Sequence, residues 1–390
     1  MKLLVLLSRF PYPLDKGDKL RAYHQLRHLA QRHQICLFAL SDERVSEADY
    51  AAVAPLCAGG VHVHRLHKPG IAAGMSRALA GRLPLQVGYF YDPAAQRRLD
   101  ALVREFRPDH VYCQLIRMAH YLRAYAGRLP MTLDYMDVFS KGMLRRAATA
   151  PRWQRPVFAL EGRRLLRYEA ASFGWFRQHT IISDQDRQLI QHPRRHDIHV
   201  VLNGIDTEFF QPQPAAPKTH DLLFCGNMSY HPNVDAAVYL AEEILPLVRR
   251  THPQARLLVA GTTPAARVQA LASEAVTISG WVEDIRTAYA AARVFVAPMR
   301  VGTGLQNKLL EAMAMELPCV TTPLANNALR GQPGHDLLIG ATAPELADHL
   351  SRLLTDATLA AQLGHQGRAF VQEHYDWDAS TRQLEALFGE

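Results

Sequence analysis

A short segment near position 300 gathers residues whose types and spacing could bind a phosphate and a sugar hydroxyl. Gly302 and Gly304 leave room for backbone N–H groups to approach a phosphate, and the N-terminus of the helix predicted to follow adds a positive field. Arg300 and Lys308 add two cations. Glu311 falls within the first turns of that helix, where a carboxylate can accept hydrogen bonds from vicinal hydroxyls of a ribose or another sugar. The alternative interpretation is a structural glycine turn followed by a Lys308–Glu311 ion pair on a helix surface.

The element order around this segment predicts parallel β-sheets. A strand over 294–298 precedes the glycine loop, and a helix from about 306 to 315 and a further strand follow it. The same strand–loop–helix–strand order covers 2–40 and returns over 221–261, where the predicted helix is 234–250. Alternating helices and apolar strands predict two similar α/β domains. Ligands of such sheets bind beyond the carboxyl ends of the strands, so we expect the site there, in a cleft between the domains.

The boundary between these domains is predicted at a proline-rich stretch. Asn203-Gly204 is a turn signal, and Pro212, Pro214 and Pro217 disfavour regular structure. The chain therefore divides into an N-terminal Rossmann-like domain, a linker, a C-terminal Rossmann-like domain and a last helix, over 1–202, 203–218, 219–374 and 375–390.

The charge divides unevenly along the chain. Residues 1–200 hold 31 Lys and Arg against 17 Asp and Glu, and residues 201–390 hold 13 against 20, so the net charges of +14 and −7 sum to +7. A basic half joined to an acidic half suggests two domains with different partners. The basic half suits phosphates or an anionic membrane. Nucleic acid is disfavoured as a partner because no recognition motif accompanies the charge.

The densest basic stretch is 141–167. It holds eight Lys and Arg against one acid, Glu161, and apolar side chains such as Trp153, Val157 and Leu160 are interleaved with the cations. This composition is typical of a segment that lies on an anionic membrane surface. A solvated helix face with ordinary core contacts explains it equally well.

Composition places the chain among ordinary folded proteins. It is 48% hydrophobic and 21% charged, which excludes disorder. The apolar run Leu3–Leu7 is too short for a bilayer span or a signal peptide. The five cysteines show no CxxC spacing, so we expect buried, reduced thiols. These features predict a cytoplasmic protein, with 141–167 as its candidate contact with the inner face of the cell membrane.

The segment 302–322 resembles the donor-binding signature of family 4 of the retaining glycosyltransferases. The matching residues are GTGLQNKLLEAMA followed by PCVTT. Other pieces that agree in order are NGIDTEFF, PQARLLVAG, SGWVEDIR and VFVAP, and the N-terminal SRFPYPLDKGDKLRAYH is similar to the opening of this family. The likeness spans nearly the whole chain and is strongest to the sugar transferases associated with exosortase (PEP-CTERM) systems.

This resemblance implies the GT-B fold, with two Rossmann-like parallel-sheet domains facing across a cleft. The C-terminal domain would hold a nucleotide-sugar and the basic N-terminal domain the acceptor, and the last helix would pack back on the N-terminal domain. The sugar would pass to a polyprenyl-linked or polysaccharide-precursor acceptor, as in exopolysaccharide biosynthesis. Its anomeric configuration would be retained, and no metal or cofactor is implied.

Residue by residue, the resemblance assigns a donor site. Glu311 matches the glutamate that binds the donor ribose, and Arg300 and Lys308 join it as candidate catalytic residues. The candidate donor-binding residues are Gly17, Gly226, Asn227, Trp281, Val282, Gly302, Thr303, Gly304, Leu305 and Asn307.

The sequence departs from the family pattern in three places. Thr303 replaces the usual glutamate eight positions before Glu311, so the role of the first carboxylate is unassigned. The Arg and Lys that usually follow the first strand of the C-terminal domain are absent, and Asn227 and Asn233 stand near their places. The charge of the donor diphosphate must then be met elsewhere, and the candidates are Arg300, Lys308 and the N-terminus of the helix that follows the glycine loop. Gln114 replaces a histidine often found after a strand of the N-terminal domain.

Candidates for the acceptor side are Gln114, His120 and Asp137. Arg117 lies nearby in the sequence, and the alternative role of these residues is packing or surface exposure. An HxHxxH pattern over 62–67 resembles a zinc ligand set, but no fourth ligand accompanies it, so no metal site is predicted.

Two other functions stay open from the sequence. A non-catalytic scaffold that binds a nucleotide-sugar would explain the missing basic residues, and it would bind the donor without transfer. A nucleotide-sugar epimerase would convert the donor with no acceptor present.

Overall fold

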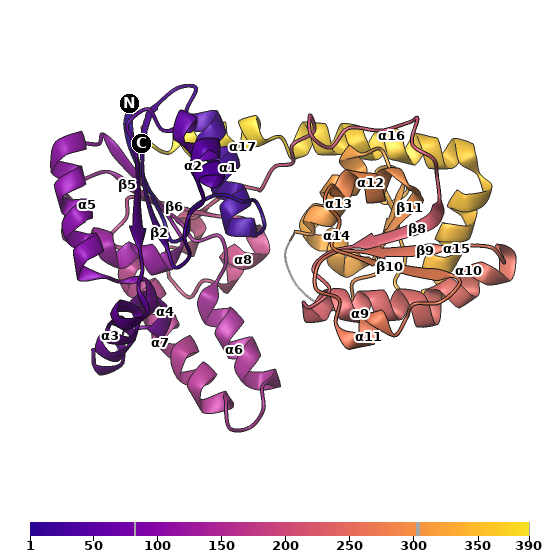
Figure 1. Ribbon diagram of the computed structural model, residues 1–390, viewed down its shortest axis with the longest axis horizontal. Coiled ribbons are helices and arrows are strands. Elements are labelled where there is room, and N and C mark those ends of the chain that lie inside the picture. Colours follow the sequence, from indigo (N-terminus) through magenta and orange to yellow (C-terminus); the bar gives the residue numbers. More distant parts are fainter. Residues whose placement is uncertain (82, 302–304, 390) are drawn as a thin grey trace. The chain divides into compact units, whose positions relative to one another are not determined.

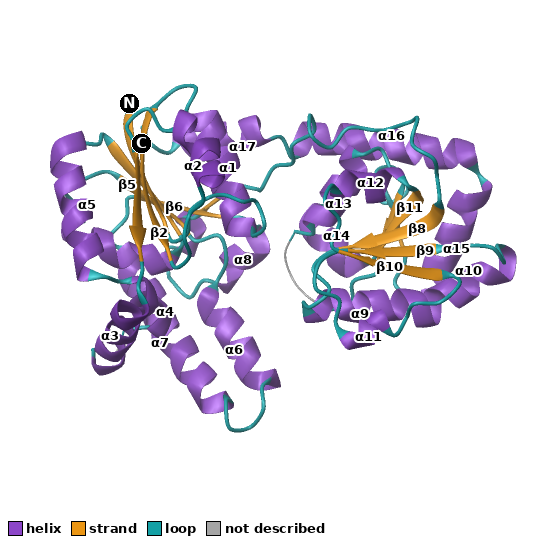
Figure 2. Ribbon diagram, viewed as in Figure 1, coloured by secondary structure: helices purple, strands orange, loops and turns teal. Residues whose placement is uncertain are grey.

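The computed structural model describes residues 1–81, 83–301 and 305–389, and the chain divides into two compact units (Figure 1). The N-terminal unit comprises Met1–Gly204 and Trp377–Glu390, and the C-terminal unit comprises Ile205–Asp376. Each unit has a central sheet with helices packed around it (Figure 2). The C-terminal unit is therefore continuous in sequence, whereas the N-terminal unit is completed by the last segment of the chain.

A seven-stranded parallel sheet forms the centre of the N-terminal unit, in the order β3-β2-β1-β4-β5-β6-β7. Its strands are β1 (Lys2–Leu7), β2 (Gln34–Ser41), β3 (Val61–Arg65), β4 (His110–Gln114), β5 (Met131–Asp134), β6 (Gln178–Ile181) and β7 (His199–Val200). The strand order reverses between β1 and β4. Ligands of such sheets bind beyond the carboxyl ends of the strands at this switch point.

The helices of this unit cover both faces of the sheet. They are α1 (Gly17–Leu29), α2 (Glu47–Val53), η1 (Ala54–Leu56), α3 (Lys68–Ala80), α4 (Leu85–Phe90), α5 (Pro93–Phe106), η2 (Ile116–Tyr125), α6 (Phe139–Thr149), α7 (Arg155–Phe173), α8 (Asp184–Leu189), η3 (Arg195–Asp197) and α17 (Trp377–Ala386). Leu3, Val5 and Leu7 of β1 enter one buried cluster, and Leu4 and Leu6 enter another. Alternate residues of a strand point to opposite faces, so β1 is buried on both sides.

The last helix, α17, belongs to the core of the N-terminal unit. Leu384 and Phe388 are buried in the same cluster as residues of α1, and the Phe388 ring lies 4.6 Å from the His110 ring. On the surface of this contact, Arg32 Nε donates to Glu385 Oε2 at 2.6 Å. The core on this face of the sheet is therefore built from both ends of the chain.

The C-terminal unit has a six-stranded parallel sheet in the order β10-β9-β8-β11-β12-β13. Its strands are β8 (His220–Cys225), β9 (Leu257–Ala260), β10 (Val276–Gly280), β11 (Ala292–Ala297), β12 (Cys319–Thr321) and β13 (Leu338–Ile339). Its helices are α9 (His231–Tyr239), η4 (Leu240–Ile244), α10 (Leu245–Thr251), α11 (Ala266–Gln269), α12 (Ile285–Ala290), α13 (Asn307–Ala314), α14 (Pro323–Leu329), α15 (Ala343–Thr355) and α16 (Ala357–His374). The strand order reverses between β8 and β11, so this unit has its own switch point.

The predicted fold class, two α/β units with parallel Rossmann-like sheets, is confirmed. The single helix predicted over 234–250 is wrong in detail, because a π-helical turn over Leu240–Ile244 separates α9 from α10. Pro246 lies in the first turn after this π segment, and a proline has no N–H to donate to the preceding turn. All five cysteines are buried and free, as predicted.

The basic stretch 141–167 forms most of a hairpin of two helices, α6 and α7, which projects from the sheet beside α3 and α4 (Figure 1). The Glu161 carboxylate accepts the backbone N–H groups of Leu85 at 2.8 Å and Gln86 at 3.0 Å. Arg164 donates to the backbone carbonyls of Leu79 and Leu83. The hairpin is therefore fixed to α3 and α4. Among the described residues, no helix is both long and apolar enough to cross a bilayer.

Candidate active site

The loops after the adjacent strands β8 and β9 meet through two glycines at the carboxyl ends of these strands. Gly226 has φ +151° and Gly261 has φ +141°. A Cβ atom on Gly261 would lie 1.7 Å from the carbonyl oxygen of Gly226, so the two backbones are in direct contact. This contact fixes the position of Gly226, one of the predicted donor-binding residues.

Glu311 lies on α13 and is held by a tyrosine that the sequence analysis did not identify. The Tyr289 hydroxyl donates to Glu311 Oε2 at 2.7 Å and lies 2.8 Å from Cys225 Sγ. A tyrosine hydroxyl carries one proton, so donation to Glu311 leaves the Cys225 thiol to donate to the hydroxyl oxygen. Burial raises the pKa of Glu311, and the Tyr289 hydrogen bond and the charge of Lys308 oppose that rise. The carboxylate is thus oriented by Tyr289 of α12, whose hydroxyl also contacts Cys225 of β8, and Glu311 as a residue is partly buried.

Lys308 lies on the same helix but does not pair with Glu311. Its Nζ donates to Asn233 Oδ1 at 2.6 Å and to Gln306 Oε1 at 3.3 Å, and it lies 5.2 Å from the centre of the Phe224 ring. Burial lowers the pKa of Lys308 to about 8. Among the described residues Lys308 forms no ion pair, and the charges of Cys225 and Glu311 nearby oppose the effect of burial only in part, so a phosphate would be a strong partner for the ammonium group.

Asn233 connects Lys308 to the loop after β8. Its Nδ2 donates to the backbone carbonyl of Asn227 at 2.9 Å, while Asn227 Oδ1 accepts the N–H of Ser229 at 2.9 Å. Helix α9 therefore contributes an amide, that of Asn233, which contacts a lysine of another element. The sequence pattern places Asn227 and Asn233 near each other, but the contact of Asn233 with Lys308 joins residues 75 positions apart.

Arg300 follows β11 and is already neutralised in part. It forms ion pairs with Asp235 at 2.9 Å and Glu243 at 3.4 Å, and its guanidinium lies 4.0 Å from the centre of the Tyr239 ring. A phosphate at this position would have to compete with two carboxylates. Lys308 is therefore the better placed of the two predicted cations.

The remaining donor-site candidates that the structure describes lie at the start of α13 and after β10. Leu305 and Asn307 are partly buried at the start of α13. Trp281 and Val282 follow β10, and the Trp281 ring is 68% exposed, so it is open to stacking by a ligand. The predicted residues Gly302, Thr303 and Gly304 lie outside the described residues.

The acceptor-side candidates lie in the N-terminal unit, at the carboxyl ends of β4 and β5. Gln114 is buried and donates to the backbone carbonyl of Asp18 at 3.1 Å. His120 is on η2, where its ring packs edge-on to Tyr91, and burial lowers its pKa. Asp137 is exposed beyond β5. Gly17, the predicted loop glycine, begins α1, and an added Cβ would meet only open space there.

A buried polar network at the end of β5 was not predicted. Arg21 Nε donates to Asp134 Oδ2 at 2.7 Å, Arg21 Nη1 donates to Asn203 Oδ1 at 2.8 Å, and the Tyr112 hydroxyl lies 2.7 Å from Asp134 Oδ2. These side chains are buried, so they cross-link α1, β4, β5 and the chain end before the C-terminal unit. The network has the character of a structural support, because no part of it reaches solvent.

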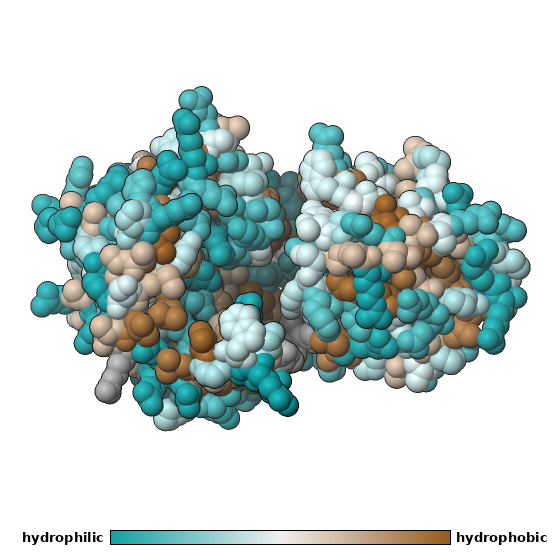
Figure 3. Space-filling model, turned by 60° about the horizontal axis from the view of Figure 1, so that its bottom comes forward, coloured by the Kyte–Doolittle hydropathy of each residue, from teal (hydrophilic) through white to brown (hydrophobic). Residues whose placement is uncertain are grey.

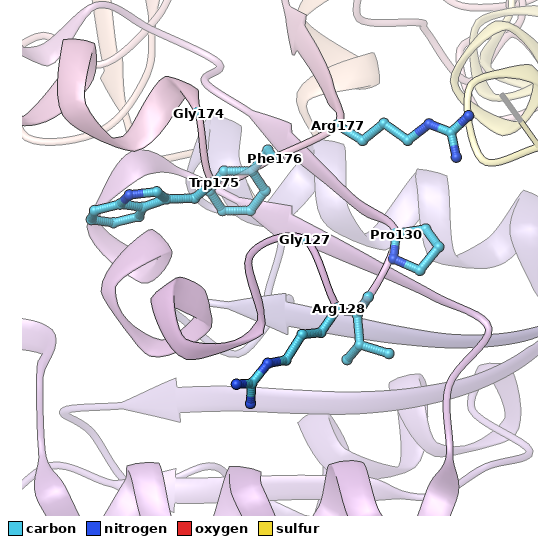
Figure 4. A pocket seen from close by; sticks show the side chains of 8 residues that line it. Gly127, Arg128, Pro130, Gly174, Trp175, Phe176 and Arg177 are labelled. Atoms are coloured by element: carbon cyan, nitrogen blue, oxygen red, sulfur yellow. The ribbon is translucent and has the colours of Figure 1, made fainter.

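One cavity of about 400 Å³ lies at the other end of the strands of the N-terminal sheet from the acceptor-side candidates, near the amino ends of β5 and β6 (Figure 4). Its lining includes Arg128, Trp175 and Arg177. The two arginine side chains extend in different directions and do not converge on a common point (Figure 4). None of the predicted site residues lines this cavity. Within the described ranges, no three His, Cys, Asp or Glu side chains gather as a metal site would require.

Comparison with protein families adds an independent observation on the C-terminal unit. Residues 219–356 match the family of group 1 glycosyl transferases. The match covers Gly226, Asn233, Tyr289, Lys308 and Glu311, the residues that the structure groups around the switch point of this unit. It supports a transferase of group 1.

Two curated relatives are similar to this chain. An uncharacterized 44.6 kDa protein in the cps region of Klebsiella pneumoniae is 22% identical over all of this chain and 99% of its own length. A GDP-mannose-dependent α-(1-6)-phosphatidylinositol monomannoside mannosyltransferase of Mycobacterium tuberculosis is 26% identical over 46% of this chain and 53% of its own length.

Solved structures share the fold at low identity. The sucrose-phosphate synthase of Thermosynechococcus elongatus has a TM-score of 0.70 at 17% identity, over 100% of this chain and 98% of its own. HepE of Anabaena, in complex with UDP-glucose, has a TM-score of 0.69 at 12% identity, over 99% of both chains. WaaG, a glycosyltransferase involved in lipopolysaccharide biosynthesis, has a TM-score of 0.65 at 14% identity, over 100% of both chains. The fold is therefore that of GT-B glycosyltransferases, as predicted.

Proposed function

We propose that the protein is a retaining glycosyltransferase that moves a sugar from a nucleotide-sugar held by the C-terminal unit to a polysaccharide precursor or a lipid-linked acceptor. The observation that carries this proposal is the group of Glu311, Tyr289, Lys308 and Asn233 at the switch point of the C-terminal sheet. It presents an oriented carboxylate and an ammonium group that forms no ion pair with a carboxylate of the described residues. HepE, which has the same fold, was solved with UDP-glucose, which supports a nucleotide-sugar as the donor.

The chemistry assigned to this group is stabilisation of a leaving nucleoside diphosphate. Lys308 and the backbone N–H groups at the start of α13 would face the phosphates, and charge that develops there is stabilised without reorganisation. The Glu311 carboxylate would accept hydrogen bonds from the ribose hydroxyls. The proposed mechanism uses no metal ion, because these groups supply the positive field themselves.

The proposed acceptor is a polysaccharide precursor or a lipid-linked sugar. The relative from the cps region supports the first, and the mycobacterial relative named for a phosphatidylinositol mannoside supports the second. The N-terminal unit is proposed to bind this acceptor because the basic half of the chain lies there and an anionic carrier would be attracted to it.

We also propose that the hairpin of α6 and α7 contacts an anionic membrane from the cytoplasmic side. Trp153 is 77% exposed, Val157 and Leu160 of α7 are exposed as well, and so is Leu79 of α3, whose carbonyl accepts from Arg164 of α7. The two acids of this hairpin, Glu161 and Glu169, are buried. Its exposed ionic groups are therefore all cations, namely Arg145, Arg146, Arg152, Arg155, Arg163 and Arg167. Figure 3 looks toward this end of the N-terminal unit and shows apolar and hydrophilic residues side by side on the surface.

The experiment that tests the function is a two-stage assay. Thermal shifts with UDP, GDP, ADP and their sugar conjugates identify the donor, and the donor is then offered with a membrane extract. We expect one nucleotide class to stabilise the protein and its sugar to appear in the lipid fraction. Binding without transfer would favour a scaffold, and conversion of the donor without acceptor would favour an epimerase.

The matched variants are Glu311→Gln and Glu274→Gln. The first removes the charge that Tyr289 orients and is expected to lower transfer about a hundredfold. The second changes an exposed glutamate of the same unit and is expected to leave transfer unchanged. Equal transfer rates in the two variants would refute the role of Glu311.

A further inference from the structure

A second cavity of the N-terminal unit lies at the end of its parallel sheet where ligands of such sheets commonly bind. It has a volume of about 280 Å³, and its lining includes Arg9, Asp42, Met75, Tyr89, Phe90 and Arg117. Three of these follow sheet strands, since Arg9 comes after β1, Asp42 after β2 and Arg117 after β4. The cavity therefore lies beyond the carboxyl ends of the strands that flank the switch point.

Arg117 is a buried cation without an anionic partner. The side chain is 9% exposed, and it makes no hydrogen bond or ion pair with any residue that the structure describes. Its guanidinium lies between two rings, 4.8 Å from the centre of Phe90 and 4.7 Å from that of Phe139. Burial, followed by the charge of Arg9, lowers the pKa of Arg117 to about 10. Burial removes most of the hydration of the Arg117 guanidinium, and the two ring contacts compensate for only part of this loss. An anion in the cavity would therefore interact strongly with the guanidinium.

The other charged groups of the cavity are already engaged. Arg9 pairs with Asp18 at 2.7 Å, and Asp42 accepts the Tyr89 hydroxyl at 2.9 Å. Asp18 and Asp42 therefore have partners of their own, and neither forms an ion pair with Arg117, although the Asp18 charge opposes in part the lowering of its pKa. Arg117 therefore contributes a positive charge that no ion pair balances among the described residues. Arg9 is a second cation at the cavity wall.

Apart from Gln86 and the Tyr89 hydroxyl, the rest of the wall is apolar, and on the side of α3 it leads toward the proposed membrane face. Met75 lies on α3 and is exposed, and Leu79 follows it one turn later on the same helix. Arg164 of α7 donates to the Leu79 carbonyl at 3.2 Å, so this turn of α3 contacts the α6–α7 hairpin. An anion bound near Arg117 would thus have hydrocarbon surface beside it on the side of α3.

We infer that this cavity binds the phosphate or diphosphate group of a lipid-linked acceptor, with Arg117 as the principal anion-binding residue and Met75 against the start of the hydrocarbon chain. That this ligand is the acceptor rests on the proposed function, whereas its affinity for the cavity does not. Asp42 is placed to accept a hydroxyl of a sugar carried on the same phosphate.

The test uses the full-length protein and farnesyl diphosphate as the probe, measured by isothermal titration calorimetry. Inorganic pyrophosphate and farnesol are titrated beside it, so that the anion and the chain are examined separately. The variant is Arg117→Met, which keeps a long apolar side chain between the two rings and removes the charge. Its control is Arg123→Met, which removes an exposed cation on the same η2 segment, 5.5 Å from the Trp175 ring and away from the cavity.

We expect Arg117→Met to weaken farnesyl diphosphate binding about tenfold or more, because a charge-assisted contact is lost, and Arg123→Met to bind like the wild type. Pyrophosphate is expected to bind more weakly than farnesyl diphosphate, and farnesol is expected to be insensitive to Arg117→Met. Unchanged farnesyl diphosphate binding in Arg117→Met would overturn the site. Equal affinity for pyrophosphate and farnesyl diphosphate would overturn the assignment to a lipid.

Thermal unfolding separates a binding role of Arg117 from a structural one. Removal of a buried unpaired cation is expected to leave the melting temperature unchanged or to raise it. A variant that unfolds at a lower temperature and still binds the probe would assign Arg117 to packing instead. If Arg117→Met fails to fold, Arg117→Lys, which keeps the charge, is expected to bind the probe, and loss of its binding together with a normal melting temperature would restrict the site to a guanidinium.

Nucleotide binding in the same variants distinguishes failure of this inference from failure of the proposed function. Arg117→Met is expected to bind the nucleotide as the wild type does, because Lys308 and Glu311 lie in the other unit. Absence of nucleotide binding in every variant would refute the proposed function and leave the anion site standing.

Discussion

The ammonium group of Lys308 makes donor binding depend on pH. Burial lowers its pKa to about 8, so the group is charged below that pH and loses its charge above it. We expect the affinity for the nucleotide to fall about tenfold or more between about pH 7 and about pH 9.5. Titration calorimetry with the best-binding nucleotide at several pH values measures this.

The matched variant for this prediction is Lys308→Arg. An arginine keeps its charge throughout this range, so its pH profile is expected to be flat even if its affinity at pH 7 is lower. A profile that falls in the same way in both proteins would show that another group titrates.

Tyr289 is expected to act on the reaction only through Glu311. Tyr289→Phe removes the hydrogen bond at 2.7 Å to Glu311 Oε2 and leaves both the carboxylate and the Cys225 thiol without this partner. The expected loss in kcat/KM is about tenfold, which corresponds to roughly 1.4 kcal/mol. Tyr230→Phe changes an exposed tyrosine and serves as the control. A structural role alone would lower the melting temperature and leave kcat/KM unchanged.

The α6–α7 hairpin is the element for which we predict lipid binding. Trp153→Ala is expected to reduce co-sedimentation with phosphatidylglycerol vesicles several-fold, because the side chain that enters the interface is removed. Binding of the wild type is expected to weaken with added salt, since the surrounding exposed ionic groups are arginines.

Trp281→Ala provides the control for the vesicle experiment. Trp281 is nearly as exposed as Trp153 but lies in the acidic C-terminal half, so its loss is expected to leave vesicle binding unchanged. Equal effects of the two substitutions would indicate non-specific adsorption of exposed tryptophans.

The helix α17 is predicted to stabilise the N-terminal unit. Phe388→Ala removes a buried ring that packs near His110 and Tyr112, and the expected cost is about 3 kcal/mol of unfolding free energy. Differential scanning calorimetry should show a lower melting temperature for the N-terminal unit. The nucleotide affinity of the C-terminal unit is expected to stay the same, and a fall in that affinity would contradict this assignment.

At the scale of the whole molecule, the sequence was sufficient to predict the two parallel-sheet units. The buried parts of strands such as β1 and β8 are continuous apolar runs, LLVLL and LLFC, and the strand–loop–helix–strand order that occurs twice predicts each unit. The π-helical turn over Leu240–Ile244 was not predicted, because helical periodicity continues through it and gives no local sign of the altered hydrogen bonding.

Only those residues of the candidate site that lie within one short sequence motif could be predicted from the sequence. Lys308 and Glu311 stand in one such motif, whereas Tyr289, Cys225 and Asn233 reach them from elements far away in sequence. The unpaired state of Arg117 could not be inferred either, since it depends on which acids the fold places elsewhere. Contacts of this kind depend on tertiary packing, and no periodic pattern in the sequence indicates them.

The discontinuity of the N-terminal unit has a consequence for how the protein is made on the ribosome. Residues 205–376 form a unit that is complete once that stretch has emerged, whereas residues 1–204 wait for Leu384 and Phe388, which are translated after that unit. Until then the cluster around β1 and α1 lacks part of its cover and exposes apolar surface. The domain whose synthesis begins first is therefore the one whose folding finishes last, and a nascent chain that stops before residue 377 would carry one finished domain and one unfinished one.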